Sequence, residues 1–335
     1  MRYDYLIYIG RFQPFHLGHE HVIREALKLS DKIIILVGSP YQPRTIRNPW
    51  DFNEREKFVR SVFTDNENKQ ILVLPIMDNI YNEAAWIKSV QQIIAGVTHL
   101  KIASNSNIGL IGHQKDESSY YLSQFPQWKR VEIKNYKNIS STDIREVYFE
   151  DATVPDTLNI EVQKQLIKFK STDGFAEVAQ EFRFVKAYKK GWENAPYEPI
   201  FVTVDAIVVQ AGHILLVKRK AQPGKGLVAL PGGFINPKEK LKDAVIRELR
   251  EETRIKVPAP VLAGSITKTE VFDDPYRSQR GRTITHAYLI ELHDTKLPKV
   301  QGSDDAEKAF WLPFADIKPE MMFEDHFHII QAMLG

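Results

Sequence analysis

Residues suited to phosphate chemistry concentrate near the start of the chain, in Gly10-Arg-Phe-Gln-Pro-Phe-His-Leu-Gly-His19. An apolar run precedes this string and a helical pattern follows it, so we expect it where a strand ends and a helix begins. His16 and His19 are three residues apart, which lets both face one anion at the start of the helix. Arg11 adds a forked donor, Gly18 allows close backbone approach, and the helix N-terminus favours negative charge. The alternative is that two histidines near a turn are ordinary surface residues.

A second group of residues that could support chemistry is a set of carboxylates in the other half of the chain. Leu241, Ala244, Val245 and Leu249 repeat at helical spacing, which predicts a helix over Lys238–Thr253. Three glutamates at positions i, i+3 and i+4 project onto one face of that helix: Glu248, Glu251 and Glu252. Because like charges repel, this face fits a hard divalent cation bound by carboxylate oxygens. A solvated charged face is the alternative for the helix taken alone.

Two shorter features lie beside these groups. Ile139-Ser-Ser-Thr-Asp-Ile-Arg145 ends the first half, and its Ser140 to Thr142 can cap a helix there. Their hydroxyls and N–H groups, together with Arg145 one turn later, can reach phosphate oxygens. The alternative is a capped helix with a purely structural role. In the other half, Glu239 at the start of the predicted helix can pair with Arg247.

The elements that position the first group alternate in type along the chain. Apolar runs of strand length are separated by helical patterns, and they are Tyr5–Ile9, Ile33–Val37 and Ile71–Ile76. This order implies βαβ units and a mostly parallel sheet. A helix over Glu83–Ala95, strands at Leu110–Gly112 and Val131–Ile133, and helices over Glu161–Lys168 and Phe175–Tyr188 complete the half.

The second half has a different rhythm. A domain boundary is indicated by three residues typical of linkers, Gly191, Pro196 and Pro199. We therefore predict a first domain over 1–188, a linker over 189–199 and a second domain over 200–335. A hairpin is expected around Ala211-Gly212, followed by the amphipathic helix and strands over Val261–Phe272 and Thr283–Leu292. The predicted fold class is α/β, with a parallel sheet in the first domain and a mixed sheet in the second.

Composition narrows the class of protein. With 335 residues, 43% hydrophobic and 26% charged, the chain is typical of a globular protein of two domains. A net charge of +2 gives no basic field for a nucleic-acid partner, and no apolar run is long enough to cross a membrane. The absence of cysteine excludes disulfides and thiolate metal sites, and no signal peptide is visible. We therefore expect a cytoplasmic protein.

His16-Leu-Gly-His19 resembles the HxGH signature of the nucleotidyltransferase superfamily, and the longer string around it is similar to the archaeal-type nicotinamide mononucleotide (NMN) adenylyltransferases. The segment 139–145 resembles the second motif of that superfamily. The resemblance implies a Rossmann-like domain in which the NMN phosphate attacks the α-phosphorus of ATP and pyrophosphate leaves. It makes His16, His19 and Arg145 catalytic, with Arg11, Arg47 and Arg145 clamping the triphosphate together with Mg²⁺. No general base is required, because the attacking phosphate is already ionised.

The same resemblance implies the remaining contacts to ATP and NMN. The segment 44–50 resembles the basic loop of the family. Arg47 is the predicted ligand in this loop. For Arg44, the alternative is that it is only a charged surface residue. Trp86 and Asn82 are candidates for the nicotinamide end, although Trp86 fits a core position equally well. The other predicted binding residues are Gly10, Phe12, Gly18, Gly112, His113, Ser140, Ser141 and Thr142.

The second half resembles a Nudix domain, an α/β/α fold. Its pattern Gly233-x5-Glu239-x7-Arg247-Glu248-Leu-x-Glu251-Glu252 matches the Nudix box, with Arg254 where the box has a late glycine and an αL conformation is expected. The resemblance implies hydrolysis of a nucleoside diphosphate derivative, with metal ligands Glu248, Glu251 and Glu252, of which Glu251 and Glu252 are catalytic.

The stretch 272–282 resembles the ADP-ribose pyrophosphatase branch of that family. The resemblance implies that Arg277, Arg280 and Arg282 contact phosphates and that Phe272 stacks on adenine. Candidates for a later catalytic base are Asp304, Asp305 and Glu307, which a plain acidic turn would also explain.

Together the halves resemble the bifunctional NMN adenylyltransferase/Nudix hydrolase proteins. The resemblance implies synthesis of NAD from NMN and ATP, and hydrolysis of ADP-ribose to AMP and ribose 5-phosphate. It implies Mg²⁺ or Mn²⁺ in both domains and small-molecule nucleotides as partners. One alternative is another phosphate acceptor, such as phosphopantetheine or a sugar phosphate. The other is a non-catalytic Nudix half that senses ADP-ribose.

Overall fold

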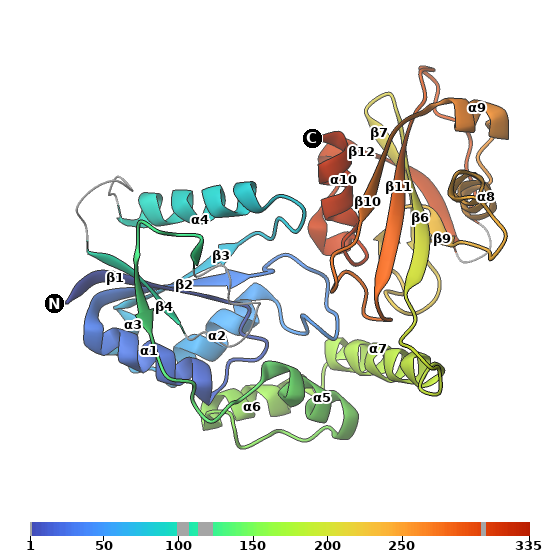
Figure 1. Cartoon of the computed structure of the whole chain (residues 1–335). Coiled ribbons are helices and arrows are strands. Elements are labelled where there is room, and N and C mark those ends of the chain that lie inside the picture. The colour runs from blue at the N-terminus through green and yellow to red at the C-terminus, as the bar shows by residue number, and fades with distance from the viewer. Residues whose placement is uncertain (1, 99–106, 113–122, 303–305) are drawn as a thin grey trace. The chain divides into compact units, whose positions relative to one another are not determined.

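The computed structural model describes residues 2–98, 107–112, 123–302 and 306–335 (Figure 1). It divides into two compact units, Met1–Gln180 and Glu181–Gly335. The division falls inside helix α7 (Asp173–Lys190), which covers the predicted helix Phe175–Tyr188. The domain limits at residues 188 and 199 stay a prediction.

The N-terminal unit is built on one parallel sheet. Its strands are β1 (Tyr3–Gly10), β2 (Ser30–Gly38), β3 (Ile71–Ile76), β4 (Ile108–Gly112) and β5 (Lys129–Glu132), in the order β3-β2-β1-β4-β5. Every neighbouring pair is parallel, which confirms the predicted Rossmann-like arrangement. The strand order reverses between β1 and β4, and ligands of such sheets bind outside the carboxyl ends of the strands at that point.

Helices cover both faces of this sheet (Figure 1). One face packs against α4 (Glu83–Thr98), where Ile7 and Leu110 meet Val90 and Ile94 in a buried cluster. The opposite face is covered by α1 (Leu17–Leu29) and α2 (Phe52–Val62). The remaining helices are α3 (Asp65–Asn68), α5 (Ser141–Asp151) and α6 (Ile160–Phe169). This layering buries the strands, which are rich in β-branched residues, on both faces, as is typical of parallel sheets.

The C-terminal unit has a mixed sheet in the order β10-β11-β6-β7-β12, with β8 on β7 and β9 on β6. The pair β11–β6 is parallel and the other pairs are antiparallel, which confirms the predicted mixed sheet. The strands are β6 (Phe201–Gln210), β7 (His213–Arg219), β8 (Val228–Ala229), β9 (Gly232–Phe234), β10 (Ile266–Phe272), β11 (Thr283–Glu291) and β12 (Ala306–Pro313).

Helices α8 (Leu241–Thr253) and α10 (His326–Leu334) lie on opposite faces of this sheet (Figure 1). The core between α8 and the sheet contains Val204, Ala206, Ala244 and Leu249. Two short 3₁₀ helices, Phe314–Asp316 and Pro319–Met321, precede α10. The unit is therefore an α/β/α sandwich that carries its carboxylate-rich helix on one outer layer.

Two local predictions had different outcomes. The hairpin between β6 and β7 is confirmed, since Ala211 and Gly212 have φ of 47° and 74°, the left-handed pair that suits a two-residue turn. The strand predicted from Val261 to Phe272 is wrong at its start, because helix α9 (Ala259–Gly264) occupies that part. A proline in the first turn of α9 suits a helix start, and Leu262 is buried.

No helix in the described residues is long and apolar enough to cross a membrane.

Candidate active sites

The N-terminal candidate site begins at the capped start of α1. His16 is the N-cap residue, and its Nδ1 accepts hydrogen bonds from the backbone N–H groups of Gly18 (3.1 Å) and His19 (3.4 Å). In return, Nδ1 of His19 accepts from the backbone N–H of His16 at 3.3 Å. The two imidazoles thus occupy the places that Ser and Glu hold in an ordinary capping box. Since each Nδ1 is an acceptor, the proton of each neutral ring lies on Nε2.

Gly18 is required by this arrangement for a reason other than the predicted approach of a ligand. A Cβ atom at position 18 would stand 2.9 Å from Cε1 and 3.0 Å from Nδ1 of His16. The ring of His16 therefore lies where any side chain at position 18 would have to go. The prediction that Gly18 binds a nucleotide stays a prediction.

The backbone between Arg11 and His16 is held from outside the string. Phe12 has a φ of 53°, and its buried ring lies 4.9 Å from the ring of His19. Gln13 is 1% exposed and forms a two-way pair with the backbone of Trp50: its Nε2 donates to Trp50 O at 2.8 Å, and its Oε1 accepts from Trp50 N at 3.1 Å. Gln13 thereby ties the signature segment to the end of the predicted basic loop.

The second motif reaches the same place from α5. Ser140 is the N-cap of α5, as predicted, and its hydroxyl accepts from Thr142 N at 3.2 Å. Arg145 is 6% exposed and donates to Gln13 O at 2.6 Å and to the hydroxyl of Thr142 at 3.2 Å. Ser141 donates to Pro14 O at 3.3 Å. The N-terminus of α5 is thus fastened to the segment that carries the histidines.

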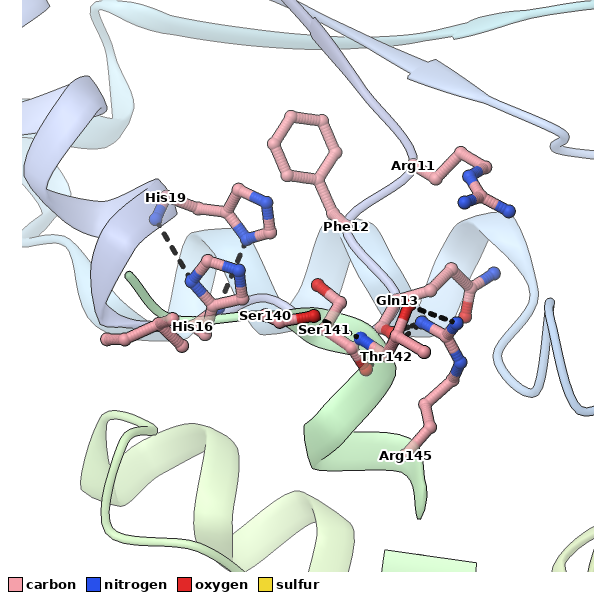
Figure 2. Close-up of a pocket in the computed structure, with 10 residues that line it drawn as sticks. Arg11, Phe12, Gln13, His16, His19, Ser140, Ser141, Thr142 and Arg145 are labelled. Carbon is pink, nitrogen blue, oxygen red and sulfur yellow. Dashed lines mark hydrogen bonds between the residues drawn. The ribbon is translucent and has the colours of Figure 1, made fainter. Parts of the chain in front are cut away.

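These two segments enclose one cavity of about 190 Å³ (Figure 2). It is lined by Arg11, Phe12, Gln13, His16, His19, Ile139, Ser140, Ser141, Thr142 and Arg145. The structure thus brings together most of the predicted phosphate-binding residues from positions more than 120 residues apart in the sequence.

The cavity is electropositive. Burial and the charges of Arg47 and Arg145 lower the pKa of Arg11 to about 9, and burial with the charge of Arg47 lowers the pKa of Arg145 to about 10. Nη1 of Arg11 and Nε of Arg145 are buried and have no hydrogen-bond partner among the described residues. Buried cations with unsatisfied donors are stabilised by an anion, and a polyphosphate supplies the matching acceptors.

Other predicted residues of this unit lie outside the lining of the cavity. Asn82 caps α4 by accepting from Ala85 N at 3.0 Å, and the ring of Trp86 packs 5.9 Å from that of Phe125 at the edge of the core. Gly112 ends β4, and His113 lies outside the described residues. Their nucleotide contacts stay predictions.

Two arginines of the predicted basic loop lie outside the lining of the cavity and differ in their interactions. Arg44 forms an ion pair with Glu54 at 2.6 Å and lies over the ring of Phe169, which supports the surface-charge interpretation made for it. Arg47 acts on the cavity through its charge, because it lowers the pKa of both Arg11 and Arg145. Its predicted contact with the triphosphate is therefore still the one to test.

The C-terminal candidate site centres on Glu252. This carboxylate accepts from the backbone N–H of Gly232 at 3.0 Å. Burial, with smaller contributions from the charges of Glu248 and Asp205, raises its pKa to about 8. A partly desolvated carboxylate with such a pKa gains stability from a cation placed beside it.

Arg247 neutralises the rest of the acidic face. Its guanidinium contacts Glu239 at 2.7 Å, Glu248 at 2.8 Å and Glu251 at 2.9 Å. The hydrogen bonds from Arg247 lower the pKa of Glu239 to about 2, and the predicted pairing of these two residues is present. Gly233 lies directly against Glu248, since a Cβ there would stand 2.8 Å from its carboxylate.

The donor set fits a hard divalent cation, because carboxylate oxygens are its preferred ligands and the half-buried Glu252 has a raised pKa. Within the described residues, however, no three His, Cys, Asp or Glu side chains are gathered around one point. Arg247 holds Glu248 and Glu251, while Glu252 turns towards Gly232. The predicted metal ligands Glu248, Glu251 and Glu252 therefore share a helix face without forming a closed metal site.

The predicted substrate-binding stretch is occupied by internal contacts. Arg277 is buried and binds both carboxylate oxygens of Asp325 at 2.9 Å. Arg282 donates to the backbone of Asp273 and contacts its carboxylate at 3.4 Å. Phe272 is 3% exposed, so its ring would have to leave the core to stack on a base. The roles predicted for these residues stay predictions.

Arg280 is the predicted phosphate-binding arginine of this stretch that forms no ion pair within 4.0 Å among the described residues. It lies over the ring of Phe234 at 5.2 Å and is half-buried. Among the candidates for a catalytic base, Glu307 pairs with Lys218 at 3.2 Å. Asp304 and Asp305 lie outside the described residues.

Sequence reasoning missed three residues that shape these sites. Gln13 belongs to the signature string but was given no role, and Asp325 holds Arg277 from 48 positions away. Arg55 is 0% exposed on α2. Its signal in the sequence is its place on the helical stripe with Phe58 and Val59.

The fold and the two sites define a nucleotidyltransferase unit joined to a Nudix unit. Residues 7–147 match the family model described as cytidylyltransferase-like, and residues 199–333 match the NUDIX domain. The first part is 37% identical over 183 residues to the nicotinamide/nicotinic acid mononucleotide adenylyltransferase of Acinetobacter baylyi, covering 54% of this chain and 95% of that protein. The second is 35% identical over 130 residues to the ADP-ribose pyrophosphatase of Methanocaldococcus jannaschii, covering 39% of this chain and 70% of that protein.

Two of the solved structures that resemble this chain cover nearly all of it. The crystal structure of a bifunctional NMN adenylyltransferase/ADP ribose pyrophosphatase from Francisella tularensis superposes with a TM-score of 0.93 at 37% identity, covering 99% of this chain and 98% of that one. A second structure of that protein, complexed with AMP and a manganese ion, gives a TM-score of 0.93 at 36% identity. The chain therefore belongs to the family of bifunctional NMN adenylyltransferases/ADP-ribose pyrophosphatases. The resemblance seen in the motifs is confirmed, and neither alternative function is favoured.

Proposed function

We propose that the N-terminal unit transfers the AMP group of ATP to NMN, which gives NAD and pyrophosphate. We propose further that the C-terminal unit hydrolyses ADP-ribose to AMP and ribose 5-phosphate. The observation that carries the first reaction is a single cavity lined by His16, His19, Arg11 and Arg145 at the N-termini of α1 and α5. The observation that carries the second is the half-buried Glu252, with a pKa raised to about 8, beside the Arg247-bound carboxylates.

In the first reaction the protein acts by positioning and by neutralising charge. The Nε2–H groups of His16 and His19 donate to phosphate oxygens, because their Nδ1 atoms are engaged by the backbone. Arg11 and Arg145 supply buried positive charge to the triphosphate. The NMN phosphate is ionised at neutral pH, so it attacks the α-phosphorus without a general base.

In the second reaction Glu248, Glu251 and Glu252 would hold the divalent ion. A bound Mg²⁺ ion would polarise the pyrophosphate and lower the pKa of an attacking water. Gly232 N–H orients Glu252, and Arg247 orients Glu239, Glu248 and Glu251. We propose Mg²⁺ as the physiological ion, with Mn²⁺ as the alternative. ATP, NMN, NAD and ADP-ribose are the proposed small-molecule partners, and a cytoplasmic location stays a prediction.

A paired assay on the full chain tests both reactions. One tube contains Mg²⁺, NMN and ATP and is analysed for NAD; the other contains Mg²⁺ and ADP-ribose and is analysed for AMP. Glu252→Gln should abolish AMP formation and leave NAD formation unchanged. His16→Asn should lower NAD formation by about 10²- to 10³-fold and leave AMP formation unchanged, so that each variant is the matched control for the other. NAD without any AMP would make the C-terminal unit a sensor or a hydrolase of another substrate. Absence of NAD would refute the assignment of NMN as acceptor.

A further inference from the structure

Arg55 is a fully buried arginine that lies outside the lining of the nucleotide cavity. It is on α2, 0% exposed, at a position where its helix otherwise buries Phe58 and Val59. Burial lowers its pKa to about 10, which leaves the guanidinium charged at neutral pH. A buried cation costs free energy unless its donors are satisfied, so its contacts have to account for its presence.

Every hydrogen bond of Arg55 in the described part of the chain goes to a backbone carbonyl oxygen. Nη1 donates to Arg11 O at 2.8 Å and to Gly38 O at 2.6 Å, and Nη2 donates to Ser39 O at 2.8 Å. Nε donates to Asp51 O, in its own helix cap, at 3.1 Å. One guanidinium therefore joins the carboxyl ends of β1 and β2 to the start of α2. Its planar fork has the geometry for this, which a lysine ammonium lacks.

The carbonyl groups that Arg55 holds belong to strained turns. Phe12, directly after Arg11, has a φ of 53°, and Ser39 has a φ of 50°. Side-chain-bearing residues rarely adopt this left-handed conformation and keep it only where neighbouring groups hold them. Arg55 binds the carbonyl immediately before Phe12 and the carbonyl of Ser39 itself. The direction in which Arg11 leaves the strand depends on the first of these contacts.

We propose that Arg55 is a positioning residue of the adenylyltransferase site, which fixes the backbone of Arg11 so that its guanidinium faces the triphosphate of ATP. Among the described residues Arg55 donates to no cavity-lining side chain; it acts through the backbone of Arg11, and its charge also lowers the pKa of the Arg11 side chain. This inference rests on the proposed adenylyl transfer. A displacement of about 1 Å in a positioning group can cost about 100-fold in rate, so the contact has measurable consequences.

The test compares Arg55→Lys with Arg60→Lys in the full chain. Arg60 is on the same helix but is half-exposed and paired with Glu56 at 2.7 Å, so it is a matched control. In Arg55→Lys we expect the Kd for ATP to rise and kcat/KM for ATP to fall by about 10- to 100-fold. The KM for NMN should stay within about twofold of the wild-type value. A general loss of structure would instead raise the KM for both ATP and NMN. Hydrolysis of ADP-ribose should be unchanged, and Arg60→Lys should match the wild type throughout.

Two results would overturn the proposal. One is unchanged affinity for ATP and unchanged NAD synthesis in a folded Arg55→Lys protein. The other is loss of the thermal unfolding transition of the N-terminal unit, which would assign Arg55 to folding. If the wild type makes no NAD from NMN, the proposed function fails; the ATP-binding comparison still decides the role of Arg55, since it uses no NMN.

Discussion

His16 and His19 cap the same helix for each other. Nδ1 of His16 accepts from the backbone N–H of His19 at 3.4 Å, Nδ1 of His19 accepts from the backbone N–H of His16 at 3.3 Å, and the rings stack with centroids 3.7 Å apart. The spacing of three residues is what an N-cap and an N3 residue require. One arrangement therefore stabilises α1 and sets both Nε2–H groups as donors towards the cavity. The structural and chemical roles of His16 can be separated by substitution.

We predict that His16→Asn keeps the helix cap and loses the donor. The amide oxygen of asparagine can take the place of Nδ1, and Asn is among the best N-cap residues. We expect kcat for NAD formation to fall by about 10²- to 10³-fold, as for loss of one oxyanion donor, with the free energy of unfolding unchanged. His16→Ala should show the same loss and also unfold about 1 kcal/mol more easily in urea. Near-normal kcat in His16→Asn would mean that His16 only caps the helix.

We predict that Gly18→Ala lowers activity without lowering stability. Alanine is favoured over glycine in a helix by about 1 kcal/mol. Its Cβ, however, would lie 2.9 Å from Cε1 of His16 and would displace that ring. The expected result is at least a tenfold fall in NAD formation (about 1.4 kcal/mol) with a thermal midpoint close to that of the wild type, because loss of the His16 cap offsets the gain in helix propensity. Gly96→Ala in α4 is the matched control, because a Cβ there meets nothing within 4 Å. Full activity in Gly18→Ala would show that His16 can work in another position.

The sequence predicted those parts of the molecule that depend on local pattern. Alternating strand and helix patterns predicted the parallel order of β1, β2 and β3, and the spacing of His16 and His19 predicted their shared site. The left-handed turn at Ala211-Gly212 was predictable because glycine and a two-residue spacing are local signals.

The parts that escaped prediction depend on contacts between distant segments. The sequence pattern predicts solvated charge for Arg55 in a helix, and only the carbonyl groups of Arg11, Gly38 and Ser39, from two other segments, make its burial possible. The sequence pattern predicts a phosphate ligand at Arg277, yet Asp325, 48 positions away, accepts hydrogen bonds from its Nε and Nη2. Such pairings are set by tertiary structure, and no local pattern reports them.

We predict that Arg254→Gly stabilises the C-terminal unit. Arg254 is the C-cap of α8 with a φ of 45°, the αL conformation expected for the residue that replaces the box glycine. That conformation costs a side-chain-bearing residue about 1–2 kcal/mol, which glycine would not lose. The greater freedom of glycine in the unfolded chain cancels about 0.4–1 kcal/mol of this stabilisation. The net gain in the free energy of unfolding should be about 0.5–1 kcal/mol in urea titrations. Arg250→Gly, inside the same helix, should instead lose about 1 kcal/mol. Equal losses in both variants would contradict the argument.

A last prediction concerns the pH dependence of stability. His326 is 6% exposed; its Nδ1 accepts from Leu230 N at 2.9 Å, and its Nε2 lies 4.0 Å from Asp205. Burial lowers its pKa to about 3, against about 6.5 in an unfolded chain. The charged groups that face it are Asp325, which raises the pKa, and Arg277, Arg219 and Arg280, which lower it. The ring therefore stays neutral in the folded protein.

Between pH 6.5 and about 3 the unfolded chain binds a proton at His326 that the folded chain does not. Its contribution to stability is thus fully present above pH 6.5 and falls as the pH drops, by up to about 1.4 kcal/mol per pH unit. Buried Asp205 and half-buried Glu324 have raised pKa values and act with the opposite sign, so the test compares the wild type with a variant. His326→Asn retains an acceptor for Leu230 N–H but does not titrate. Urea unfolding of both proteins at several pH values should show a steeper acid loss in the wild type, and parallel curves would mean that His326 becomes protonated in the folded state.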